Sequence, residues 1–118
     1  MADSIVASKA FKFAIRIVKL YSFLKSQKQE YVLAKQLLRS GTSIGANAEE
    51  AIAAQSRADF INKLSIALKE TRETSYWLRL LHATDYLDEV AFQNIHSDCL
   101  ELQKMLSSII LSTKKNNS

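Results

Sequence analysis

The sequence predicts an all-α protein folded as an up-down-up-down four-helix bundle. The 118 residues include no Pro and only two Gly, so the chain lacks the turn residues that a protein of many short strands needs. Apolar residues make up 47% and charged residues 24% of the chain, which is typical of a folded protein. Apolar residues recur every three or four positions in four long segments. Short polar breaks between these segments favour antiparallel neighbours.

The first predicted helix covers residues 3–25 and the second covers residues 30–54. In the first, one face gathers Phe13, Ile17, Leu20 and Leu24, with Ala14, Val18 and Tyr21 beside them. In the second, one face gathers Leu33, Leu37, Ile44, Ala48 and Ala51. The small residues around Gly41 and Gly45 would let another helix approach closely. A phosphate-binding loop is a weaker interpretation, because no Lys follows the second Gly.

The third predicted helix covers residues 57–82 and the fourth covers residues 89–112. Ser56 and Asp59 have the spacing of a capping box, and Asp88 is placed to cap the fourth helix. The apolar seam of the fourth helix contains Phe92, Ile95, Cys99, Leu102, Leu106 and Ile109. We therefore expect one domain that spans residues 1–118.

The location of the protein is predicted from its single cysteine and its N-terminal pattern. One Cys cannot form an intramolecular disulfide, and a free thiol suits a reducing compartment. The first residues lack the basic and apolar regions of a signal peptide. No 18-residue apolar run indicates a membrane span. We expect a cytoplasmic protein without a membrane partner.

Basic residues are concentrated in the first predicted helix. The net charge is +4 and the isoelectric point about 9.3. Residues 1–29 contain six Lys or Arg and one Asp, whereas residues 84–118 contain three Lys and five Asp or Glu. At 100° per residue, one narrow arc of the helix contains Lys9, Lys12, Arg16 and Lys19. This stripe is interpreted either as a solvated face or as a nucleic-acid-binding face.

The third predicted helix has two apolar faces. Phe60, Leu64, Ala67, Thr71 and Leu78 form one face. The second face contains Ile66, Trp77 and Leu80. A helix in a lone bundle needs one apolar face, and Trp is common at protein interfaces. The second face therefore predicts self-association, with a monomer of enlarged core as the alternative.

Four polar residues adjoin the apolar faces of the second and third helices: Asn47, Glu50, Glu70 and Glu73. We interpret them as contacts that hold a neighbouring helix or subunit in register, because an unpaired buried carboxylate is costly. Arg72 and Arg79 are the expected partners.

No catalytic or metal site is predicted. Di-iron bundles use Glu-x-x-His pairs, but Arg79 and Gln93 stand three residues before His82 and His96. We assign both histidines to surface or cap positions and Cys99 to the core. The sequence thus predicts no enzyme activity, no metal and no cofactor.

Several segments carry a family resemblance. They are the runs 36–40, 43–51 and 70–78, together with Ser56, Asp59, Phe60, Lys63 and Leu64. In these segments the chain resembles the four-helix bundle proteins encoded in bacterial 23S rRNA intervening sequences, which are related to the accessory variability protein of diversity-generating retroelements. The resemblance implies a ring-like homopentamer without enzymatic activity, a possible RNA or reverse-transcriptase-type partner, and signature positions at Asn47, Glu50, Glu70 and Glu73.

The combined prediction is a non-enzymatic oligomeric adaptor that binds structured RNA or an RNA-protein complex through the basic stripe of the first helix. The alternative is a homo-oligomeric scaffold that binds only protein, with no nucleic-acid binding.

Overall fold

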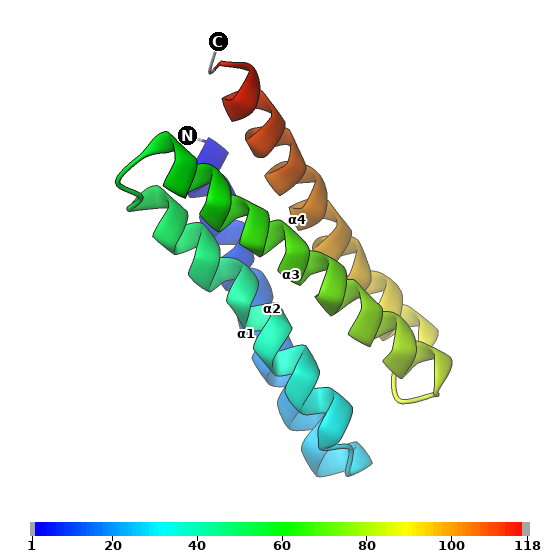
Figure 1. Cartoon of the computed structure of the whole chain (residues 1–118). Coiled ribbons are helices and arrows are strands. Elements are labelled where there is room, and N and C mark those ends of the chain that lie inside the picture. Colours follow the sequence, from blue (N-terminus) through cyan, green and yellow to red (C-terminus); the bar gives the residue numbers. More distant parts are fainter. Residues whose placement is uncertain (1, 117–118) are drawn as a thin grey trace.

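Four long helices make up the bundle in the computed structural model, which describes residues 2–116 (Figure 1). They are α1 (Ala2–Lys28), α2 (Val32–Ile52), α3 (Arg57–Ala83) and α4 (Glu89–Lys115). The described residues contain no strand, so the predicted all-α class is confirmed.

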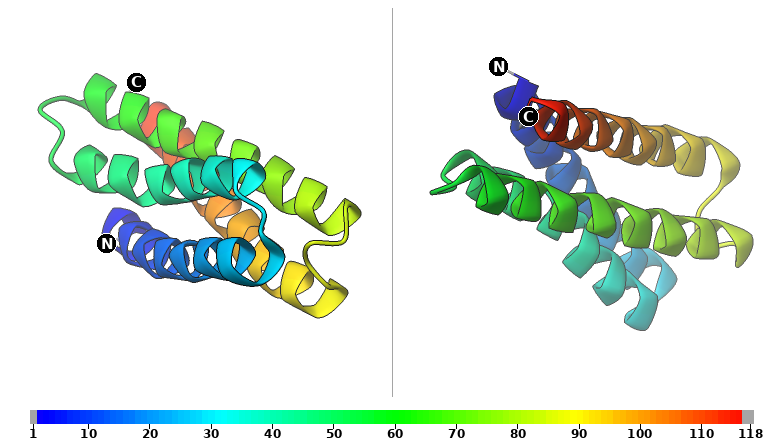
Figure 2. Two further views of the ribbon diagram at one scale, coloured as in Figure 1. Left: turned by 90° about the horizontal axis from the view of Figure 1, so that it is seen from below. Right: turned by 45° about the horizontal axis from the view of Figure 1, so that its top comes forward.

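The helices follow one another up and down the bundle. α1 packs on α2, α2 on α3 and α3 on α4, and α4 returns to contact α1. Figures 1 and 2 show that the two ends of the chain lie at the same end of the bundle, as an even number of antiparallel helices requires. The resulting rod measures 50 × 21 × 19 Å, so side faces of the helices form most of its surface.

Side-chain caps set the starts of α3 and α4. The Ser56 hydroxyl accepts a hydrogen bond from the Asp59 backbone N–H at 3.1 Å. The Asp88 carboxylate accepts one from the Ala91 backbone N–H at 2.8 Å. The N-cap positions predicted for Ser56 and Asp88 are confirmed. Each cap satisfies a backbone donor that the first turn of a helix leaves unpaired.

The start of α2 differs from the prediction. The Glu30 carboxylate accepts a hydrogen bond from the Ala34 backbone N–H at 2.9 Å, and Gln29 adopts a left-handed conformation with φ of 49°. Glu30 therefore lies in the turn and stabilises the first turn of α2, which begins at Val32 and not at residue 30.

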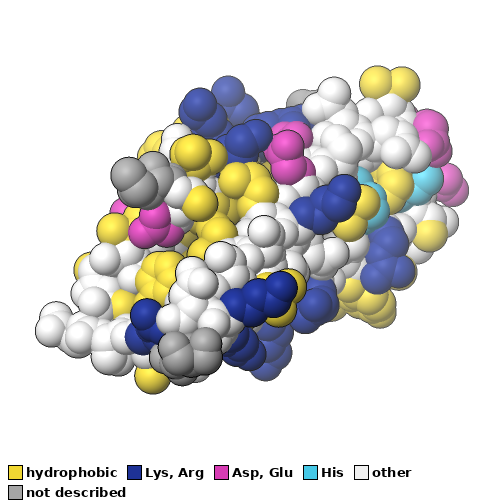
Figure 3. Space-filling model, turned by 90° about the horizontal axis from the view of Figure 1, so that it is seen from above, with side chains coloured by type: hydrophobic (Ala, Val, Ile, Leu, Met, Phe, Trp, Pro, Cys, Tyr) yellow, Lys and Arg dark blue, Asp and Glu magenta, His cyan; other side chains and the backbone are white. Residues whose placement is uncertain are grey.

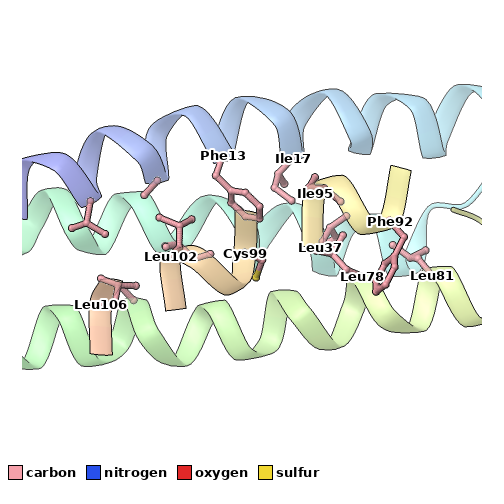
Figure 4. Close-up of a cluster of buried hydrophobic side chains, with 14 of the residues drawn as sticks. Phe13, Ile17, Leu37, Leu78, Leu81, Phe92, Ile95, Cys99, Leu102 and Leu106 are labelled. Carbon is pink, nitrogen blue, oxygen red and sulfur yellow. The ribbon is translucent and has the colours of Figure 1, made fainter. Parts of the chain in front are cut away.

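The core runs along the whole bundle. Figure 4 shows Phe13 and Ile17 of α1 pointing into the bundle, toward labelled core side chains of α2, α3 and α4. Each helix contributes buried apolar side chains at spacings of three or four residues. At the end of α4 the buried residue is Ile110, whereas the predicted Ile109 is only partly buried.

The close contact between α1 and α2 depends on a glycine. A Cβ atom added at Gly41 would lie 2.8 Å from two carbons of Ile17, which is fully buried. A Cβ added at Gly45 would lie 3.4 Å from the nearest atom, the carbonyl oxygen of Ala10. Gly41 is thus required for the helices to approach, and Gly45 is not.

Replacing the two glycines in turn tests this difference. Gly41→Ala gains about 1 kcal/mol in helix propensity, but crowding a stiff β-branched side chain costs about 1–3 kcal/mol, so we expect a net loss of stability. Gly45→Ala is the matched control, and we expect it to be neutral or to stabilise by up to about 1 kcal/mol. Urea denaturation of both variants measures the difference. Equal stability of the two would contradict the proposed Gly41 constraint.

Candidate functional site

The basic stripe of α1 faces α4, and two of its four residues form ion pairs there. The Lys9 ammonium lies 3.0 Å from a carboxylate oxygen of Glu101. The Arg16 guanidinium pairs with Asp98 and also donates to the Asn94 side-chain oxygen at 2.6 Å. These side chains are about half exposed, so each pair contributes at most about 1 kcal/mol. Their effect is to neutralise half of the stripe.

Lys12 and Lys19 remain exposed on α1. Within residues 2–116, neither lysine forms an ion pair. The positive charge available to a partner on this stripe is therefore carried by two lysines in each chain.

An apolar surface lies beside these lysines. Phe11, Ile15 and Val18 are 62%, 43% and 46% exposed, and together with Ala14 they form the α1 apolar face. A shallow hollow lies among these four side chains, and Lys19 borders it. In knobs-into-holes packing, one side chain of a helix inserts into a hole formed by residues i, i+3, i+4 and i+7 of the facing helix. The four residues of the α1 apolar face have this spacing. The sequence pattern places Ala14 and Val18 beside the core residues of this helix, so the exposure of this face was not predicted.

The second apolar face of α3 is partly covered within the chain. Ile66, Trp77 and Leu80 are each partly buried, and Trp77 packs against the core. The Trp77 ring meets Tyr76 edge to face, with centroids 5.0 Å apart. Its indole N–H donates to the Glu73 carboxylate at 3.0 Å. Trp77 thus already has an apolar and a polar partner in a single chain.

Ion pairs connect α2 to α3, but through different residues from those expected. Arg39 of α2 pairs with Glu73 and, at 3.5 Å, with Glu70. Lys63 of α3 pairs with Glu50 of α2 at 2.9 Å. Arg72 and Arg79 were the partners expected for Asn47 and Glu50. Within residues 2–116, Lys63 takes this place beside Glu50.

The side chain of Asn47 makes a local contact. Its amide donates to the Ser43 backbone carbonyl at 2.9 Å, within α2. Within residues 2–116, the three glutamates of this set form ion pairs between α2 and α3. A contact between Asn47 and another subunit stays a prediction.

The surroundings of Glu73 favour its ionised form. The hydrogen bond from Trp77 and the contact with Arg39 lower the pKa of Glu73 below its usual value. One carboxylate oxygen of Glu70 is buried and finds no hydrogen-bond donor among the described residues. An unsatisfied buried acceptor is costly.

The two histidines enclose an aromatic ring between α3 and α4. The imidazole of His82 stacks on the Phe92 ring with the ring centroids 4.2 Å apart. The imidazole of His96 also stacks on Phe92, with the centroids 4.7 Å apart. His82 also pairs with Glu89 at 3.0 Å, and His96 shares a hydrogen bond with the Ser75 hydroxyl at 2.8 Å. Figure 3 shows histidine side chains beside hydrophobic ones near one end of the bundle. The expected surface or cap roles are thus replaced by a role in joining two helices.

Cys99 is chemically protected. Its side chain is fully buried and donates to the Thr71 carbonyl oxygen at 3.3 Å. Burial raises the pKa of the thiol to about 12, so the reactive thiolate is scarce near neutral pH. The predicted core position of Cys99 is confirmed.

The described residues 2–116 contain no group of three or more His, Cys, Asp or Glu arranged to hold a metal ion. In the same range, no helix is long and apolar enough to cross a membrane.

Comparisons with known proteins agree with the fold. The sequence profile of the family described as "23S rRNA-intervening sequence protein" matches residues 2–108. A crystal structure of a protein of unknown function from the S23 ribosomal protein family, from Bacteroides thetaiotaomicron VPI-5482, is similar with a TM-score of 0.92. The two sequences are 56% identical, over 93% of this chain and 98% of that one. No curated protein matches the sequence.

The stability of the α3–α4 contact should depend on pH through His96. Burial, and then the charge of Arg79, lowers the pKa of His96 in the folded chain. Since the unfolded chain binds this proton more readily, stability is present above the ordinary histidine pKa of about 6.5 and is lost as pH falls below it. We expect His96→Gln to reduce this loss between pH 7.5 and 5.5 in thermal melts. His82→Gln, which retains His96, is the control, and an unchanged pH profile for His96→Gln would contradict the assignment.

Proposed function

Because the chain belongs to the 23S rRNA-intervening sequence protein family and leaves an apolar face of α1 uncovered, we propose that it is a non-enzymatic adaptor that works through self-association. The observation that carries this proposal is the exposure of Phe11, Ile15 and Val18 on adjacent turns of one helix.

Three features support an interface at this position. A contiguous apolar surface facing water is unfavourable and marks a contact site in many proteins. Phe is enriched at interfaces, and the hollow among the four side chains offers a place for an inserted side chain. The rod shape presents α1 along its length, so a second long element could lie against it.

The remaining reactive groups support a role without catalysis. The Cys99 thiol is buried and has a raised pKa. His82 and His96 stack on Phe92, and Glu50, Glu70 and Glu73 pair with bases on the neighbouring helix. Each group therefore has a structural partner that accounts for its position.

Light scattering tests self-association. We expect the wild-type chain at micromolar concentration to exceed the monomer mass of 13.3 kDa, and the resemblance suggests five copies. The double variant Phe11→Ser and Ile15→Ser should weaken association by about 10-fold or more, since truncating a central apolar anchor costs about 2 kcal/mol. Val90→Ser is the control, because Val90 is 78% exposed but lies on α4. A wild-type monomer would contradict the proposal.

RNA binding is a second candidate, favoured by the unpaired Lys12 and Lys19. Two lysines bind phosphate weakly, but repetition of the stripe around an oligomer would multiply the contacts. Each phosphate contact should contribute a log-log salt slope of about 0.7 to 0.9.

Charge reversal separates this candidate from a protein-only scaffold. Lys12→Glu with Lys19→Glu should abolish retention of structured RNA at low salt in filter binding. Lys69→Glu with Lys104→Glu changes the net charge equally at exposed positions on α3 and α4, and should retain binding. If the wild type binds no RNA at low salt, the RNA candidate is rejected and the protein-only scaffold remains.

A further inference from the structure

We propose that a groove between the C-terminal half of α1 and the start of α4 binds an amphipathic helix of another protein. The bound helix would have an apolar face between an acidic edge and a basic edge. This groove is distinct from the α1 apolar face. Its lining residues on α1 lie roughly 140° around the helix from Phe11, Ile15 and Val18, so the two surfaces face different directions.

The groove consists of two hollows with a common wall. The larger has a volume of about 590 Å³ and the smaller about 300 Å³. Leu87, Asp88 and Ala91 line both hollows, so the two are continuous. The opposite wall is made by residues of α1, in order along the helix: Arg16, Lys19, Leu20, Phe23 and Lys28.

The groove begins where the ion pairs between α1 and α4 end. Lys9 pairs with Glu101. Further along α1, Arg16 pairs with Asp98 and donates to Asn94. These contacts step along both helices toward the start of α4. Past Asn94, no ion pair joins α1 to α4 within residues 2–116, and the hollows occupy this part of the contact.

Apolar side chains form the floor of the groove. Leu87 and Ile95 are buried where they join the core, whereas Leu20 is partly buried and Ala91 is exposed. Val90, on the α4 side, is 78% exposed. Apolar side chains of a ligand would remove this surface from water, which is the main source of affinity in a hydrophobic groove.

The two walls of the groove carry opposite charges. On the α1 wall, Lys19 and Lys28 are exposed and form no ion pair within residues 2–116. Across the groove, Asp85 and Asp88 are exposed and likewise form no ion pair in this range. A helix with an acidic and a basic edge complements both walls. RNA fits less well, because its phosphates would meet the two aspartates.

The length of the groove suits a short helix. The α1 residues that line it extend from Arg16 to Lys28, which is about 18 Å at 1.5 Å per residue. This distance corresponds to roughly three turns of a bound helix. Apolar side chains at positions i, i+3, i+4 and i+7 of such a helix would all reach the floor of the groove.

Fluorescence anisotropy with a defined peptide tests the proposal. The probe is a labelled helical peptide of about 15 residues, with Leu at i, i+3, i+4 and i+7, Glu along one edge and Lys along the other. The wild-type chain should bind it saturably. A peptide of the same composition whose leucines form no stripe should not bind. Failure of the first peptide to bind, or equal binding of the two, would overturn the proposal.

Variants in the groove locate the binding site. Ala91→Arg places a long side chain in the groove from an exposed position and should raise the peptide Kd about 10-fold or more. Ala58→Arg is the matched control, at an exposed alanine in the first turn of α3, and should leave the Kd unchanged. Lys19→Glu should weaken binding of the probe and strengthen binding of a peptide with Lys on both edges. An unchanged Kd for Ala91→Arg and Lys19→Glu would reject this groove as the site.

Two further measurements separate the groove from a subunit contact. Phe11→Ser with Ile15→Ser should retain peptide binding, and its loss would place the peptide on the α1 apolar face instead. Ala91→Arg should have the wild-type mass in sedimentation velocity, and a changed mass would make the groove a contact between copies of the chain. Either of these contrary results overturns the proposal. A wild-type monomer that binds the peptide would contradict self-association but support the groove. Circular dichroism checks that each variant remains helical.

Discussion

The close contact between Ile17 of α1 and Gly41 of α2 sets the arrangement on which the rest of the bundle depends. Because Gly41 has no side chain, the fully buried Ile17 can lie directly against the α2 backbone, which fixes the rotation of α1 about its own axis. Two consequences follow on the other sides of the helix. Lys9 and Arg16 face α4, and Phe11, Ile15 and Val18 face away from the core.

The same rotation of α1 determines how much charge the basic stripe offers to a partner. The sequence shows six bases and one acid in residues 1–29, but it does not show that the acids of α4 lie opposite. Once Glu101 and Asp98 are paired with Lys9 and Arg16, the stripe is locally much less charged. The surface beside it is apolar, and Lys12 and Lys19 border it on one side. Protein contact is therefore the better supported use of this side of α1, with RNA binding dependent on repetition of the two lysines.

Local physics allowed much of the fold to be predicted from the sequence. The caps at Ser56 and Asp88 are hydrogen bonds between residues three positions apart, so the local sequence is enough to predict them. The Glu30 contact was missed because its side chain reaches a backbone N–H four residues on, from within a turn. Partners of Glu70 and Glu73 could not be predicted, since Arg39 reaches them only through the relative rotation of α2 and α3.

Periodicity also failed to separate the two apolar faces of α1, and the reason bears on function. Phe13 and Phe11 differ by two positions and have the same hydrophobicity, yet the first is 2% exposed and the second 62%. A pattern of spacing identifies both faces as apolar but contains no information on which one the neighbouring helices cover. On α3 the second face is partly covered by packing and by the Trp77 contact with Glu73, which the chain supplies itself. On α1, nothing among residues 2–116 covers Phe11, Ile15 and Val18, so the burial of this face would require another molecule.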